Sequence, residues 1–284
     1  MKFREIVLFE LYYRKNRPAT YIYFLILLGI SIFALSSKAV TLFGAGTMVS
    51  ANAPVIVAKM MSALSLVFVF ITSAIMGVSI LRDFEHKIAS LLYITPLHKW
   101  QYLLGRFMGS FITLLLIFLG VILGMLLTEF IPTSHSAGLL PFSLSTYLYP
   151  FVLVVIPNLL FTATLFFMVG ALSRSMLMVY VQGIGLFLIY AILDESVFDF
   201  MGNKTLAALL DPMALHTLLI ESEYWSVAQQ NQQMIGVNSL LGLNRLIWLS
   251  VTVLLWFIAF RKFKFELIGS KVRLVRNNMF APFY

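Results

Sequence analysis

The side chains that could carry catalysis or bind a metal are few in this 284-residue chain. The sequence has no His-Glu-x-x-His motif, no Gly-x-Ser-x-Gly motif and no Walker lysine loop. It has no cysteine, which excludes disulfides and thiol catalysis. The histidines are scattered over both sides of the membrane topology derived below: His86, His98, His135 and His216. We therefore expect no enzyme activity, no cofactor and no metal site in this chain.

The composition shows what kind of elements hold these residues. Apolar residues make up 61% of the chain and charged residues 11%, with a mean hydropathy of +0.94, far outside the range of soluble domains. A membrane-spanning helix needs about 20 apolar residues, and six continuous runs approach or exceed that length. They are 19–36, 63–81, 103–128, 146–172, 176–193 and 246–260, the last of which can borrow residues 240–243. We predict a single all-α membrane domain, 1–284, with six transmembrane helices.

The charges orient these helices. With the N-terminus in the cytoplasm, only four of the 20 basic residues fall in external segments: Lys38, Lys59, Lys204 and Arg245. The positive-inside rule is then satisfied at every loop, so both ends are predicted to be cytoplasmic. Because the basic residues follow the membrane boundaries, the net charge of +8 indicates contact with lipid headgroups rather than nucleic acid. We expect a multi-pass protein of the bacterial inner membrane.

The cytoplasmic segment 82–102, between the second and third spans, is the most informative polar stretch. Its helical spacing places four apolar residues on one face: Phe84, Ile88, Leu91 and Leu92. Thr95 and Pro96 then end this helix and begin the next one. Such an amphipathic element can dock into a groove of a cytoplasmic partner or lie against lipid headgroups, and the pattern alone leaves both open.

Three other segments complete the predicted layout. Residues 1–18 form a basic interfacial helix, 194–244 form an external segment of short helices, and 261–284 form a basic cytoplasmic tail.

Pro157 and Asn158 mark a kink or a polar point of a translocation pathway, the plain kink being favoured. The pairs Gly105/Gly109 and Gly120/Gly124 allow helices to approach closely, for example at a dimer interface. The spans lack charges near the membrane centre, which disfavours ion-coupled transport and an intramembrane enzyme.

The chain resembles the membrane subunits of type 2 ABC exporters. The resemblance rests on the six-span layout and on short matching stretches, of which the following are typical: Phe9-Glu10-Leu11, Arg82-Asp83-Phe84-Glu85, Thr95-Pro96-Leu97, Asp211-Pro212, Tyr224-Trp225 and Asn244-Arg245. More narrowly, it resembles Bacteroidota-type permeases whose membrane halves can be fused to an aminopeptidase-like domain. The chain departs from the fused form by ending at Tyr284 without a peptidase motif, so both a separate half-permease and a fragment stay open.

The resemblance implies that segment 83–93 is a coupling helix that inserts into a groove of an ATPase subunit. The implied docking residues are Asp83, Phe84, Glu85, Lys87, Ile88, Leu91 and Leu92, with Arg174 as a second contact. It further implies that ATP and Mg²⁺ bind to that ATPase and that a second permease half completes the translocation path. The substrate, and whether the two halves are identical, are not specified.

A second interpretation of the same sequence is a membrane scaffold that transports nothing. It would anchor a complex of the envelope or of surface motility, and its cytoplasmic helices would hold partners without an ATPase. The presence or absence of a partner ATPase distinguishes the two hypotheses.

Overall fold

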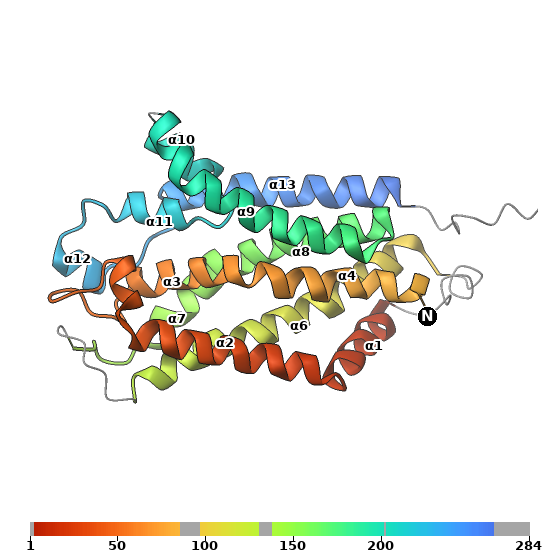
Figure 1. Cartoon of the computed structure of the whole chain (residues 1–284), viewed down its shortest axis with the longest axis horizontal. Helices are drawn as coiled ribbons and strands as arrows, with labels where there is room; N and C mark the ends of the chain where they lie inside the picture. The colour runs from red at the N-terminus through yellow and green to blue at the C-terminus, as the bar shows by residue number, and fades with distance from the viewer. Residues whose placement is uncertain (1–2, 86–96, 131–137, 202, 264–284) are drawn as a thin grey trace, which may run out of the picture.

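The computed structural model describes residues 3–85, 97–130, 138–201 and 203–263, with the side chains of 84–85 and 192–201 left aside. Over these ranges the fold is entirely helical, and its long helices run along a common axis (Figure 1). The long elements are α1 (Phe3–Lys15), α2 (Pro18–Ser36), α3 (Pro54–Val67), α4 (Val69–Glu85), α6 (Lys99–Thr128), α8 (Ile156–Ser173), α9 (Met176–Met201) and α13 (Leu240–Lys262). The short elements are η1 (Lys38–Phe43), α7 (Leu144–Pro150), η2 (Phe151–Val155), α10 (Lys204–Leu210), α11 (Leu215–Glu221) and α12 (Val227–Gln232).

Four helical stretches are long and apolar enough to cross a membrane: α2, α6, Leu144–Ser173 and α13. The pair α3 and α4 adds a fifth if it counts as one span bent by 48°. In α9 the apolar part, Met176–Ala191, is shorter. The structure is thus consistent with a multi-pass membrane protein, while the arrangement of six spans with both ends inside stays a prediction.

α3 begins earlier than its apolar run indicates, and α13 begins at the first of the residues that its run can borrow. α3 begins at Pro54, which suits the first turn of a helix because proline has no N–H to leave unpaired there. Lys59, which the sequence places in an external segment, therefore lies within α3 and is buried, with its ammonium 3.4 Å from the carbonyl oxygen of Phe43. α13 begins at Leu240, so Arg245 also lies inside a helix.

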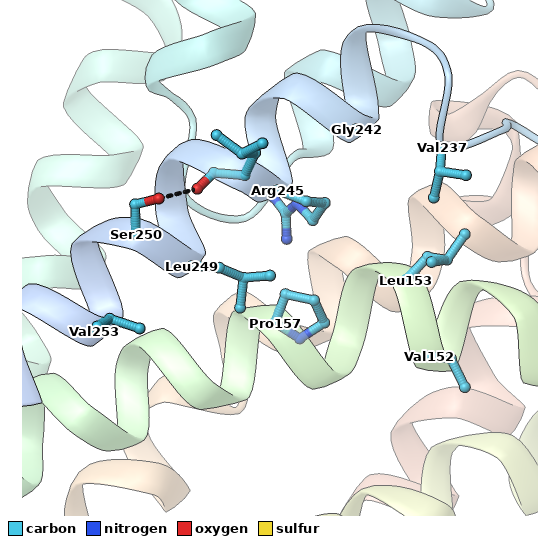
Figure 2. Close-up of a pocket in the computed structure, with 10 residues that line it drawn as sticks. Val152, Leu153, Pro157, Val237, Gly242, Arg245, Leu249, Ser250 and Val253 are labelled. Carbon is cyan, nitrogen blue, oxygen red and sulfur yellow. Dashed lines mark hydrogen bonds between the residues drawn. The ribbon is translucent and has the colours of Figure 1, made fainter.

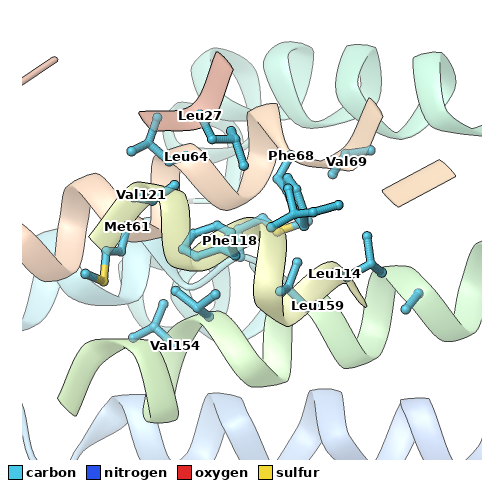
Figure 3. Close-up of a cluster of buried hydrophobic side chains, with 14 of the residues drawn as sticks. Leu27, Met61, Leu64, Phe68, Val69, Leu114, Phe118, Val121, Val154 and Leu159 are labelled. Carbon is cyan, nitrogen blue, oxygen red and sulfur yellow. The ribbon is translucent and has the colours of Figure 1, made fainter. Parts of the chain in front are cut away.

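The core lies around α6, which runs through the middle of the bundle (Figure 1). Phe118 of α6 is fully buried and packs edge-on against Phe68, with 5.4 Å between ring centroids. Phe68 stands at the break between α3 and α4 and is fully buried. Leu27 of α2 and Leu159 of α8 belong to the same cluster, so one core joins the long helices (Figure 3).

The glycines of α6 form a seam against α1 and α2. A Cβ atom at Gly109 would meet the side chain of Glu10, and one at Gly120 would lie 2.7 Å from the carbonyl oxygen of Phe24. The small residues predicted to permit close helix approach do so within this chain. The structure therefore gives these pairs a role that does not involve a dimer interface.

Candidate functional site

Five charged side chains converge at the end of the bundle where α1, the last turn of α4 and the first turns of α6 meet (Figure 1). We call this group the charge cluster: Glu10 and Arg14 of α1, Arg82 and Asp83 of α4, and Arg106 of α6. All five are buried, with Glu10 at 0% exposure and Asp83 at 2%. Buried charges are rare unless they are paired, so their partners decide what this site does.

Arg106 connects the two acids of the charge cluster. Its Nη1 donates to Glu10 Oε1 at 2.5 Å, and its Nη2 lies 2.7 Å from both carboxylate oxygens of Asp83. Glu10 Oε1 also accepts from Arg82 Nη2 at 2.7 Å, and Asp83 accepts from the hydroxyl of Tyr102 at 2.8 Å. An unbroken chain of charge-assisted hydrogen bonds thus joins α4 to α1 and α6.

Arg14 extends the charge cluster along α1. Its Nη2 donates to the carbonyl oxygen of Ile75 at 2.6 Å, which ties α1 to α4 a second time. Its Nε lies 3.9 Å from Glu10 Oε2, one turn earlier on the same helix. Burial lowers the pKa of the Arg14 guanidinium, and the attraction of Glu10 opposes that shift only in part.

Aromatic rings cover the outer side of the charge cluster. The guanidinium of Arg82 lies 3.9 Å from the centroid of Tyr13, and that of Arg106 lies 5.4 Å from the centroid of Phe9. Both distances are within the range of cation–π attraction. Among the described residues, three guanidinium groups of the cluster face two carboxylates, so these rings supply additional favourable contacts to the cations.

The predicted docking residues lie at or beyond the edge of this site. Asp83 belongs to the charge cluster, where Arg106 and Tyr102 hold its carboxylate. The backbone of Phe84 and Glu85 forms the last turn of α4. The remaining docking residues lie outside the described residues: Lys87, Ile88, Leu91 and Leu92. The docking face itself thus stays a prediction.

Arg174 ends α8 with a left-handed backbone, at φ 52° and ψ 31°. Its N–H donates to the carbonyl oxygen of Gly170 at 3.1 Å, which closes the helix before α9 begins. The turn lies at the same end of the bundle as the charge cluster (Figure 1). The contact of Arg174 with a partner stays a prediction.

Pro157 and Asn158 lie in an interrupted helix, in which a π-helical turn, η2, joins α7 to α8. Such turns occur where a helix is bent or adapted to a function. Asn158 is 1% exposed, its Nδ2 donates to the carbonyl oxygen of Met213 at 3.0 Å, and its Oδ1 accepts from Arg245 at 2.6 Å. Both ends of the amide are therefore used in packing, as expected for a kink held by neighbouring elements.

Sequence reasoning missed two features of these sites. Neither Arg106 nor Arg245 is among the site residues predicted from sequence, yet both are buried and hydrogen-bonded. Residues 1–18 are predicted as a basic interfacial helix, whereas the buried side of α1 also holds the charged residues Glu10 and Arg14 beside Ile6. The spacing of Glu10 and Arg14 by one helical turn was the available signal.

Among the described residues, no three His, Asp or Glu side chains form a group that could hold a metal ion.

The chain was compared with protein-family models and with curated proteins. No protein-family model matches the chain, and no curated protein matches it. The resemblance to type 2 ABC exporter permeases therefore remains a prediction from short motifs and layout. What stands without it is an all-helical fold with several helices able to cross a membrane and a buried charge cluster at one end of the bundle.

Proposed function

We propose that this chain is the membrane subunit of an ATP-binding cassette exporter, with ATP and Mg²⁺ bound by a separate ATPase subunit. The observation that carries the proposal is the charge cluster, which ties α1 and α6 to the last turn of α4. The predicted coupling helix, 83–93, begins in that turn and continues along the chain beyond α4. Any displacement of this segment by a partner would be passed on to three helices together.

The physical argument concerns stiffness. Opposite charges in a poorly polarisable interior attract each other more strongly than at the surface, and parting them leaves unpaired buried charges. The parts of α1, α4 and α6 that the charge cluster joins are therefore expected to move together. α6 begins beside it and is 30 residues long, or about 45 Å, so a tilt imposed at this end would reach the opposite end of the bundle.

The proposal includes a second permease half and the inner membrane of a bacterium as the location. In this scheme two chains of this kind, or this chain and a related one, line the path between them, and closure of two ATPase subunits drives the change of access. The segment around α10 to α12 lies at the other end of the bundle, where it would cover the exit (Figure 1).

Affinity purification from native membranes tests the proposal. We expect the tagged chain to retain a near-stoichiometric partner that carries Walker motifs. Leu91→Asp on the predicted apolar face should lower that recovery by about tenfold or more, because a charge buried in an apolar groove costs over 1.4 kcal/mol. Ser90→Asp, on the predicted polar face of the same helix, is the matched control and should leave recovery unchanged.

Two outcomes would contradict the proposal in different ways. Recovery of envelope or motility proteins without any ATPase would support the scaffold. Full recovery of the ATPase by both the Leu91→Asp and the Phe84→Asp variants would leave the exporter standing but remove segment 83–93 as the docking element.

A further inference from the structure

A groove of about 720 Å³ lies between α13 and the η2–α8 stretch. Its walls are largely apolar and include Val152, Leu153, Leu246, Leu249 and Val253. Figure 2 shows the guanidinium of Arg245 reaching between α13 and Pro157 of α8, toward the middle of this groove. The Ser250 hydroxyl also borders it but donates to the carbonyl oxygen of Leu246 at 2.7 Å. Arg245 is therefore the only charged side chain among the described lining residues.

The guanidinium of Arg245 is hydrogen-bonded to neutral oxygens but forms no ion pair with a described carboxylate. Its guanidinium donates to neutral oxygens: Asn158 Oδ1 at 2.6 Å, Asn244 Oδ1 at 2.5 and 3.0 Å, and the backbone carbonyls of Val154 and Pro212 at 3.5 and 3.4 Å. No carboxylate of the described residues forms an ion pair with it. The nearby acid, Asp211, accepts hydrogen bonds from the backbone N–H groups of Met213 and His216 instead. Asp211 attracts the 6% exposed guanidinium from nearby, but among the described residues no carboxylate is in direct contact with this cation at the apolar groove.

The position of Arg245 along α13 sets the depth of this charge. Arg245 is the sixth residue of the helix, about 7 to 8 Å from its first residue, and Val253 lies about 12 Å further along. At the opposite end of the helix stand Arg261 and Lys262. In a membrane-spanning α13 the guanidinium is therefore at the level of the lipid headgroups, while Leu249 and Val253 face the acyl-chain region.

We propose that this groove binds an anionic phospholipid, with its phosphate beside Arg245 and an acyl chain along Leu249 and Val253. The positively charged guanidinium would attract an anion. The exposed apolar wall beside it would contact a hydrocarbon chain of the same molecule. Basic pockets between transmembrane helices are the usual sites for acidic headgroups, and the volume is within the range of ligand sites. The inference rests on α13 spanning the membrane and is independent of any ATPase.

The test uses the whole chain in lipid nanodiscs that contain a photoactivatable phosphatidylglycerol or a phosphatidylcholine with the same acyl chain. Mass spectrometry then locates the crosslinked residues. We expect phosphatidylglycerol to label the groove about fivefold more than phosphatidylcholine, the preference that one basic residue gives near an anionic headgroup. Val253→Trp should lower this labelling several-fold by filling the groove. Leu254→Trp, at an exposed neighbouring position outside the groove, should not.

Three results would overturn the inference. Equal labelling by both lipids would show that the charge of Arg245 selects nothing. Unchanged labelling in Val253→Trp would place the lipid elsewhere. A disulfide between two copies of a Val253→Cys variant in native membranes, which is unambiguous because the chain has no cysteine, would assign the groove to a protein interface.

Discussion

At the scale of single residues, Arg106 is the centre of the charge cluster. One guanidinium serves Glu10 of α1 and Asp83 of α4 at the same time, so its loss affects three helices. Buried ion pairs do not always add stability in net terms, because both partners lose their hydration. Removing one partner, however, leaves the other charge buried and unpaired, which is consistently unfavourable.

Arg106→Gln is therefore expected to lower the free energy of unfolding by about 3 to 5 kcal/mol, since Asp83 would keep, among the described residues, only the hydroxyl of Tyr102 as a side-chain partner. Thermal unfolding of the purified protein in detergent measures the effect. Lys15→Gln is the control, because Lys15 is an exposed cation on α1 next to the same cluster, and we expect a change within about 0.5 kcal/mol. Similar melting temperatures for the two variants would show that the charge cluster does not hold the helices together.

Glu221 gives a pH dependence whose sign can be worked out. Its carboxylate accepts from the backbone N–H of Leu241, at the start of α13, at 3.3 Å, and burial raises its pKa above the ordinary value of 4.5. The folded state then holds this proton at a higher pH than the unfolded state does. Stability from this group is therefore present below the unfolded pKa and is lost as pH rises through the folded pKa.

Glu221→Gln should remove that dependence, because the amide oxygen can still accept from Leu241 but does not titrate in this range. We expect the wild-type melting temperature to fall, relative to that of the variant, as pH rises above 4.5. Unfolding scans of both proteins over a series of pH values measure the difference. A difference that does not change with pH would mean that the carboxyl group is solvated as in the unfolded chain.

The residue scale is also where sequence reasoning reached least far. Charge and spacing identify Glu10 and Arg14 as neighbours on α1, but the partners that neutralise Glu10 lie 72 and 96 residues away. No local pattern selects Arg82 and Arg106 from the other basic residues of the cytoplasmic segments. A charged residue near a helix end usually extends its side chain toward water, as at the exposed Lys262. This rule fails where another helix covers that end of the helix.

At the scale of elements, the sequence predicted the type of nearly every long helix, because continuous apolar runs leave few alternatives. It placed helix starts less well. α3 and α13 begin with apolar residues, but Lys59 interrupts the first run and Asn244 and Arg245 interrupt the second, and tertiary partners accommodate these polar side chains inside the fold. Asn244, for instance, donates to the carbonyl oxygens of Ala208 and Asp211, which lie more than 30 residues earlier.

The glycine seam of α6 gives a prediction at this scale. A Cβ atom at Gly124 would lie 2.6 Å from the carbonyl oxygen of Leu28, which is backbone and cannot turn aside. Gly124→Ala should therefore push α2 and α6 apart and cost about 1 to 3 kcal/mol of stability, as overpacking typically does. Gly29→Ala in α2 is the control, because a Cβ atom there meets nothing within 4 Å and alanine favours a helix.

Thermal unfolding of both alanine variants distinguishes the two interpretations of this seam. If the glycines serve a dimer interface instead, Gly124→Ala would alter the oligomeric state and leave the stability of the single chain unchanged. A loss of stability at constant oligomeric state is the outcome that the packing of α6 against α2 requires.

At the scale of the whole molecule, the exporter and the scaffold both depend on which end of the bundle is cytoplasmic. The structure gathers α1, the charge cluster, Arg174 and the end of α13 at one end, and α12 at the other (Figure 1). Charge alone predicted this grouping, because the positive-inside rule needs only the order of basic segments along the chain. The contacts between those segments needed the fold.

Single cysteines introduced into this naturally cysteine-free chain test the orientation. Lys15→Cys in α1, Ala228→Cys in α12 and Lys262→Cys in α13 are all at exposed positions. In intact spheroplasts a membrane-impermeant maleimide should label Ala228→Cys, and it should label the other two only after permeabilisation. The unsubstituted chain is the control and should not react.

The opposite labelling pattern would have a larger consequence than a redrawn topology. The charge cluster and the segment that follows α4 would then face away from the cytoplasm, where no ATP-driven partner can reach them. The exporter proposal would then fail, because its docking segment would be on the wrong side of the membrane. The inference that the groove beside Arg245 binds lipid would still hold, because it requires only that α13 cross the membrane. The orientation of the chain therefore tests the exporter, which needs an ATPase in the cytoplasm, but not the binding of lipid, which needs only the bilayer.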